Sequence, residues 1–319
     1  MRLDGSDDNT YVEDRRGESA GGGFGGSGLG GGGFGIPIGR GMGIGGTILL
    51  LVLSLVFGGN FFGGGGGGAG RAPVNAPPGS GYPGGGPASG VAGGEVAPGG
   101  AVNESARERE TRRFIVAVLN NAQQTWAQTL PRQAGQEYRP ARLVLFREAV
   151  QSGCGRAPAA VGPFYCPRDE RVYLDLSFYD ELATKFGAPG DFAQAYVLAH
   201  EIGHHLQKQL GTEARVRQLQ AQRPQLENNL SVRLELQADC YAGVWGAAAR
   251  ESRLLSAGDV EEGLAAAAGV GDDRIQQRSR GDVNPDSFTH GSSAQRTRWF
   301  MRGFESGDMN SCNTFEGAV

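Results

Sequence analysis

Helical periodicity dominates the C-terminal two thirds of the chain. Apolar residues within 106–129 recur at intervals of three and four, which predicts an amphipathic helix. The same kind of pattern predicts helices at about 179–187, 191–210, 212–229, 231–254 and 292–304. Segments 142–146 and 172–178 are rich in β-branched and aromatic residues and alternate roughly with polar ones, which predicts two strands. We therefore expect a helix-rich α+β domain with a small sheet over residues 105–319.

An uncharged apolar segment at 44–62 interrupts a polar, Gly-rich region. It reads IGGTILLLVLSLVFGGNFF and is long enough to cross a hydrocarbon core of about 30 Å as a helix. A signal peptide is one alternative, although such a peptide does not normally begin this far from the N-terminus. A buried core helix is another, but the flanking segments offer it nothing to pack against. We expect a single transmembrane helix at 44–62.

Glycine content separates the N-terminal part from the rest. The chain has 319 residues and 56 Gly, of which 37 lie in residues 1–100. A segment so rich in Gly loses too much backbone entropy on folding to form a packed domain. We therefore expect a disordered tail at 1–43 and a flexible Gly/Pro-rich linker at 63–104. The net charge of −4, without a block of basic residues, argues against a protein that grips nucleic acid by its phosphates.

A metal-binding motif lies within the helix expected at 191–210. His200-Glu201-Ile202-Gly203-His204 fits the pattern H-E-x-x-H. Residues four apart share one helix face, so His200 and His204 can reach one zinc ion while Glu201 projects beside it. Zinc lowers the pKa of a bound water to about 7, and Glu201 is then placed to take its proton as general base. A chance match remains the alternative.

The helix expected at 231–254 offers a third ligand. Glu235 and Asp239 lie four residues apart there, with mostly apolar neighbours. We expect Glu235 to complete the metal site and Asp239 to accept a hydrogen bond from a ligand histidine. Two acidic residues on a solvated helix face are the alternative. The apolar neighbours weaken it, because an isolated carboxylate is costly to bury there.

HEIGHH followed by ELQAD resembles the gluzincin metallopeptidases, and among them most the bacterial neutral zinc metallopeptidase family (YpfJ type). Segments 12–17, 164–178 and 290–304 also look like that family's pattern. The resemblance implies a zincin-like domain, preceded by a membrane segment, that hydrolyses peptide bonds with zinc.

The HtpX-like and CaaX-processing membrane zinc proteases share the first two motifs and add a later H-x-x-x-x-x-R. His290 and Arg296 match it in this chain. The resemblance implies that His290 hydrogen-bonds the oxyanion of the reaction intermediate and that Arg296 orients the site. A structural cap on the helix at 292–304 is the alternative for His290.

The four cysteines are even in number and point to an oxidising compartment. Cys154 and Cys166 bracket a loop rich in Gly and Pro, which leaves Cys240 and Cys312 to pair with each other. Four buried thiols are the alternative. With two disulfides, we expect the domain to lie on the extracytoplasmic side of a bacterial cytoplasmic membrane.

These observations together predict a membrane-anchored, single-pass zinc endopeptidase that acts on a protein or peptide substrate. The strand expected at 172–178 is a candidate edge for binding an extended substrate. Two alternatives remain: a non-catalytic, zinc-stabilised binding module on a membrane tether, and a surface protein with an accidental motif. Glu201 argues against the binding module, because a purely structural site needs no general base.

Overall fold

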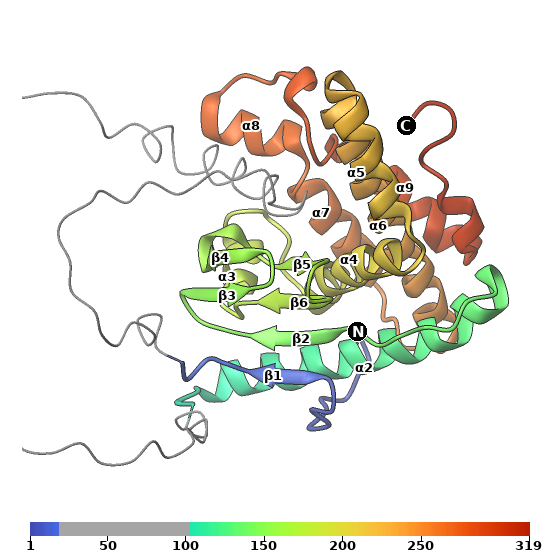
Figure 1. Cartoon of the computed structure of the whole chain (residues 1–319). Helices are drawn as coiled ribbons and strands as arrows, with labels where there is room; N and C mark the ends of the chain where they lie inside the picture. The colour runs from blue at the N-terminus through green and yellow to red at the C-terminus, as the bar shows by residue number, and fades with distance from the viewer. Residues whose placement is uncertain (19–101) are drawn as a thin grey trace, which may run out of the picture.

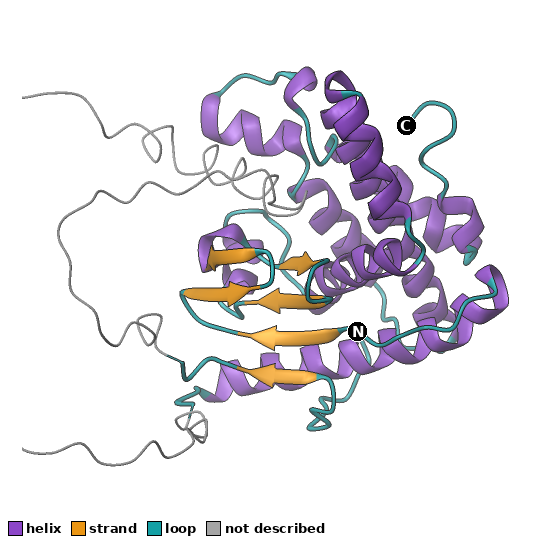
Figure 2. Ribbon diagram, viewed as in Figure 1, coloured by secondary structure: helices purple, strands orange, loops and turns teal. Residues whose placement is uncertain are grey.

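The computed structural model of the protein describes residues 1–18 and 102–319. The helices are α2 (Ala106–Ala134), α3 (Phe178–Thr184), α4 (Asp191–Gln209), α5 (Thr212–Gln222), α6 (Glu227–Glu251), α7 (Asp259–Gly269), α8 (Asp272–Arg280) and α9 (Ser293–Ser306). The strands are β1 (Val12–Asp14), β2 (Arg142–Leu145), β3 (Ala149–Ser152), β4 (Gly155–Pro158), β5 (Phe164–Cys166) and β6 (Arg171–Leu174). The strands gather in one part of the molecule and most of the helices stack beside them (Figure 1; Figure 2). This is the helix-rich α+β architecture with a small sheet that the sequence predicts.

The main sheet has the strand order β1-β2-β6-β5. β1, β2 and β6 run parallel, whereas β5 runs antiparallel to β6. Strands β3 and β4 form a separate hairpin. The expectation that the strand at 172–178 offers a free edge is wrong, because β2 and β5 occupy both edges of β6. The strand also ends at Leu174, and Phe178 begins α3.

Helix α4 occupies the centre of the molecule, packing against α2, α6 and α7 and against strands β5 and β6. Helix α6 also packs against α9. Two glycines allow α6 and α9 to cross closely: a Cβ at Gly303 would lie 1.9 Å from the carbonyl oxygen of Cys240, and one at Gly243 2.0 Å from that of Phe300. No larger residue fits either position without moving the helices apart.

The first 18 residues belong to the folded domain. β1 pairs with β2, and the backbone N–H of Leu143 donates to the carbonyl of Tyr11 at 2.8 Å. The expectation of a disordered tail is therefore wrong for residues 1–18. A short polar segment gives little sign of a strand by itself, but β2 presents an open edge that β1 covers. Residues 19–43 lie outside the described part of the chain.

The predicted transmembrane helix at 44–62 and nearly all of the predicted linker at 63–104 also lie outside the described residues. Among the residues that the structure does describe, no helix is both long enough and apolar enough to span a membrane.

Two disulfides join distant parts of the domain. Cys154–Cys166 links the β3–β4 turn to β5, and Cys240–Cys312 links α6 to the C-terminal segment. The structure thus has the pairing expected from the sequence, and the alternative of four thiols does not hold. The second bridge fixes the C-terminal segment on α6, the helix that carries Glu235.

Candidate metal centre

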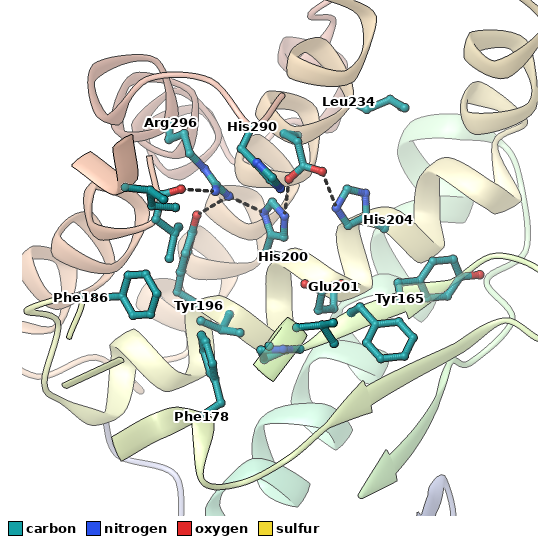
Figure 3. A pocket seen from close by; sticks show the side chains of 18 of the residues that line it. Tyr165, Phe178, Phe186, Tyr196, His200, Glu201, His204, Leu234, His290 and Arg296 are labelled. Atoms are coloured by element: carbon teal, nitrogen blue, oxygen red, sulfur yellow. Dashed lines mark hydrogen bonds and ion pairs between the residues drawn. The ribbon is translucent and has the colours of Figure 1, made fainter. Parts of the chain in front are cut away.

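Helices α4 and α6 bring His200, His204 and Glu235 together (Figure 3). The two histidines lie one turn apart on α4, and Glu235 faces them from α6. Gly203, inside the motif, allows this approach, because a Cβ there would lie 2.9 Å from the Cα of Ala238. The glycine of H-E-I-G-H thus sets the spacing between the two helices that hold the cluster.

The cluster has the dimensions of a zinc site. His200 Nε2 lies 3.1 Å from Glu235 Oε2, and His204 Nε2 lies 3.5 Å from Glu235 Oε1. Tetrahedral zinc with bonds of about 2.0–2.1 Å separates its ligand atoms by about 3.4 Å. Two imidazoles and one carboxylate are also ligand types that zinc favours, and they leave one tetrahedral position open. The residues present therefore fit a zinc ion.

A hydrogen bond at Nδ1 orients each of the two imidazoles. His200 Nδ1 lies 2.9 Å from Asp239 Oδ1, and His204 Nδ1 lies 2.9 Å from Gln207 Oε1. Gln207 is itself fixed by donating to the carbonyl oxygen of Leu234 at 2.7 Å. Since Asp239 and Gln207 present acceptor oxygens, each Nδ1 carries a proton, and each Nε2 faces the metal position, where it would bind an ion once its own proton is released.

Asp239 is the centre of a buried polar network. It is fully buried, and Arg296 from α9 donates to it at 2.8 Å through Nε and at 2.9 Å through a terminal nitrogen. Tyr196, one turn before His200 on α4, donates its hydroxyl to the same carboxylate. Burial favours the protonated acid, but the charges of Arg296 and His200 outweigh it and lower the pKa of Asp239 to about 2. The carboxylate stays ionised and holds His200 in place.

Electrostatics couple the histidines to Glu235. Burial opposes the charged form of His200, but Asp239 and Glu235 outweigh it and raise its pKa to about 9. Burial likewise opposes ionisation of Glu235, yet the charge of His204 and hydrogen bonds from both histidines hold its pKa well below its ordinary value. The cluster therefore stabilises cations at this point, as a metal site requires.

Glu201 lies in the wall of the cavity beside this cluster, between His200 and Tyr165 in the view of Figure 3. Its side chain is buried, and burial raises its pKa even though the nearby histidine charges oppose the rise. The backbone N–H of Tyr165 on β5 donates to it. A carboxylate whose pKa is raised is a stronger proton acceptor than an exposed one, as a general base requires.

His290 also faces the cavity, from the loop that precedes α9. Its Nδ1 lies 3.1 Å from Asp272 Oδ1, while its backbone N–H donates to Oδ2 of the same residue at 2.6 Å. Burial lowers the pKa of His290, but Asp272 outweighs it and raises the pKa overall. The alternative of a helix cap does not hold, because Ser292 caps α9 through a capping box with Gln295.

Sequence reasoning missed three members of the site: Tyr196, Gln207 and Asp272. Tyr196 could have been found from the sequence, because it lies one turn before His200 on the same helix face. Gln207 could also have been found, because it lies three residues after His204 on the same helix, whereas nothing in the sequence points to Asp272, which the fold brings to His290. His205, next to His204 in the sequence, is not part of the cluster: it is buried and contacts the hydroxyl of Tyr165 and the carbonyl of Arg139.

A cavity of about 190 Å³ joins these groups. The site residues that line it are Tyr196, His200, Glu201, His204, Gln207, Glu235, His290 and Arg296. A helix bearing H-E-x-x-H, a glutamate from a second helix and a cavity beside the motif's glutamate are the features of a zincin-type metallopeptidase.

Comparison with known proteins identifies the family. Residues 85–315 match the family described as "Putative neutral zinc metallopeptidase", and the chain belongs to it. It is 45% identical to the uncharacterized protein YpfJ of Escherichia coli K12 over the full length of both chains. It is 43% identical to the uncharacterized protein Rv2575 of Mycobacterium tuberculosis over 70% of this chain and 78% of that one. No solved structure matches the chain.

Proposed function

We propose that the protein is a zinc-dependent endopeptidase that hydrolyses peptide bonds of a protein or peptide substrate. The observation that carries the proposal is the position of Glu201 in the cavity wall beside the three-ligand cluster. His200, His204 and Glu235 would hold the ion. Bound zinc supplies Lewis acidity, which polarises a carbonyl and acidifies water. Glu201 accepts the proton of the attacking water and passes it to the leaving amine.

His290 and Arg296 have supporting roles in this proposal. His290 presents its imidazole to the cavity while Asp272 holds its other side, so it donates a hydrogen bond to the developing oxyanion. Arg296 acts through Asp239, whose orientation it fixes, and thereby positions His200. The two disulfides support placement of the domain in an oxidising, extracytoplasmic compartment. Membrane attachment through residues 44–62 stays a sequence prediction.

The Glu201→Gln variant tests the assignment. We expect it to keep one zinc per chain and to cleave a peptide library about 10²–10⁴-fold more slowly than the wild type. His204→Ala serves as the contrast, because it should lose the zinc itself. Metal content by mass spectrometry and cleavage measured on the same samples separate the two effects. Unchanged turnover in Glu201→Gln would contradict the proposed base.

A further inference from the structure

One end of the cavity beside the metal cluster is apolar. Its wall is formed by Val161, Phe178, Phe186, Val197, Val270 and Ile275. These side chains come from the segments before β5 and α4, from α3 and α4 themselves, and from the region around α8. Phe178 and Phe186 are only half-buried and touch each other, with ring centroids 6.2 Å apart. Half-buried aromatic rings facing a cavity are surfaces that an apolar ligand group can cover.

The two charged residues that line this end pair with each other, while Arg278, which does not line the cavity, lies over the Phe186 ring with its guanidinium carbon 5.8 Å from the ring centroid. Lys185 and Glu181 also line the cavity, and Lys185 Nζ donates to Glu181 Oε1 at 2.8 Å. A ligand group at this end therefore meets apolar side chains and a compensated ion pair. An acidic or basic group would lose its hydration here without gaining an opposite charge of its own.

Strand β5 supplies a direction for the ligand. It is the last strand of the sheet, and among the described residues no strand pairs with its outer edge. Phe164 and Tyr165 of β5 line the cavity. An extended peptide that adds to this edge would direct alternate side chains into the cavity, next to Glu201. The cavity of about 190 Å³ is smaller than typical small-molecule pockets of about 300–1,000 Å³, which suits one peptide side chain.

We propose that the end of the cavity at Phe178, Phe186 and Ile275 binds a large apolar side chain of a peptide substrate adjacent to the bond that is cleaved. This inference rests on the proposed peptidase function and names its substrate class. Phe186 and Phe178 are then specificity-determining residues, and peptides with an acidic residue at that position are excluded by desolvation.

Binding to the zinc-loaded Glu201→Gln variant tests the proposal separately from cleavage. Fluorescent peptides differ at one central position, which is Phe, Leu, Ala or Asp in an otherwise constant background. We expect the Phe and Leu peptides to bind at least about tenfold more tightly than the Ala and Asp peptides. Adding Phe186→Ala should reduce this difference to about threefold or less, and Phe186→Leu should retain most of it. Leu226→Ala is the matched control, because Leu226 is an exposed apolar residue that does not line the cavity.

The outcomes separate the two proposals. Equal binding of all four peptides, or a preference that survives both Phe186→Ala and Phe178→Ala, overturns the apolar subsite. If the wild type still cleaves peptides in that case, the peptidase function stands without it. A wild type that holds zinc but neither binds nor cleaves any peptide removes both.

A second inference concerns the N-terminal segment. The backbone N–H of Arg15 donates to the carbonyl of Leu145 at 2.8 Å, beside the pairing of β1 with β2. Arg16 is 4% exposed and binds Asp14, Glu104 and Glu108 at 2.7–2.9 Å. Two of these carboxylates follow the undescribed stretch 19–101 in sequence, so Arg16 ties together the segments on either side of it.

These contacts constrain how the chain meets a membrane. A single crossing between residues 18 and 102 would place β1 and β2 on opposite sides of a hydrocarbon core about 30 Å thick, whereas paired strands lie about 4.8 Å apart. We infer that residues 1–18 and 102–319 lie on the same side of the membrane. This inference departs from the single-pass arrangement expected from the sequence, which places the two segments on opposite sides.

Cysteine labelling in intact cells tests this arrangement with the full chain. Asn9→Cys and Asp282→Cys place one reactive thiol on each segment at exposed positions, while the native cysteines are held in disulfides. A membrane-impermeant maleimide is added before or after lysis. We expect both thiols to behave alike, labelled either before lysis or only after it. Labelling of one before lysis and of the other only after it would overturn the inference.

Discussion

At the scale of single residues, Asp239 has two roles, and one substitution should affect both of them in ways that two measurements can tell apart. It holds the outer nitrogen of His200 and neutralises Arg296, and all three side chains are buried. Substituting it leaves His200 without its orienting acceptor and Arg296 without its counter-charge. The effect should therefore appear both in zinc affinity and in the stability of the metal-free protein.

We expect Asp239→Ala, which removes the acceptor oxygen as well as the charge, to lower zinc affinity about 10–100-fold, as loss of an orienting partner does in other zinc sites. It should also destabilise the fold by about 3–5 kcal/mol, because Arg296 keeps a buried charge without a partner. Zinc competition titrations and urea unfolding of the metal-free protein measure the two effects. Asp282→Ala, at an exposed position, is the control. An unchanged zinc affinity would show that Asp239 does not orient His200.

The residues of the metal cluster show which contacts a sequence can predict and which it cannot. His200, His204 and Glu201 share one local motif, and Glu235 with Asp239 repeats the four-residue spacing on a second helix, so the pattern alone grouped them. Asp272 lies 18 residues from His290, and nothing in the spacing connects the two. Contacts made by one helix face are visible in a sequence, and contacts between helices are not.

At the scale of the elements, the crossing of α6 and α9 determines where Arg296 lies. The helices touch at Gly243 and Gly303, and this contact places Arg296 of α9 against Asp239 of α6. The helices in contact here were predictable from their apolar periodicity. Helix α8 was not, because Ile275 is the one apolar residue among its nine. Strand β5 was not predictable either. Its three residues lie between Pro163 and Pro167 and gain their strand geometry from pairing with β6.

Gly303→Ala tests the importance of the close crossing. The added methyl would meet the carbonyl oxygen of Cys240 at 1.9 Å, so the helices must separate, at a cost of about 1–3 kcal/mol or more. We also expect weaker zinc binding, because Arg296 moves with α9. Gly246→Ala is the graded control, since its methyl would meet side chains and no backbone: the Phe304 ring at 3.1 Å and the Phe192 ring at 3.5 Å. Urea unfolding and zinc titration compare the two variants; equal effects would contradict a role for the crossing.

At the scale of the whole molecule, residues 1–18 are held mainly by polar contacts. Arg16 binds three carboxylates, and Asn120 donates to the carbonyl of Asp8 at 3.1 Å. Nothing in the residue pattern joins this segment to the domain, because its partners lie about a hundred residues away and its own pattern is polar. A β-strand that completes another strand's edge needs little apolar character of its own, so periodicity does not reveal it.

The attachment of residues 1–18 to the domain should weaken as the pH falls. Burial favours the protonated form of Glu104, but hydrogen bonds from Arg16, Arg112 and Arg109 outweigh it and lower the pKa of Glu104 to about 2. A carboxyl group with a lowered folded-state pKa stabilises the fold above its ordinary pKa, about 4.5, and that contribution disappears as the pH falls through about 2. We expect the backbone N–H of Arg15 to lose hydrogen-exchange protection over this range, before the helical core does.

Arg16→Ala should produce the same loss at neutral pH. Without the guanidinium, Glu104 and Glu108 keep their arginine partners within residues 102–319, but the ion pairs that join them to the N-terminal segment are lost. We therefore expect at least about tenfold less protection of the Arg15 amide. The protection of the Arg15 amide should then depend less on pH, because the ion pair between Arg16 and Glu104, which protonation of Glu104 would break, is already absent. Arg15→Ala is the control, since the Arg15 side chain pairs with Glu13 and makes no contact with Glu104 or Glu108. Full protection in Arg16→Ala would mean that strand pairing alone holds the segment, and the acid dependence would then have to arise from another group.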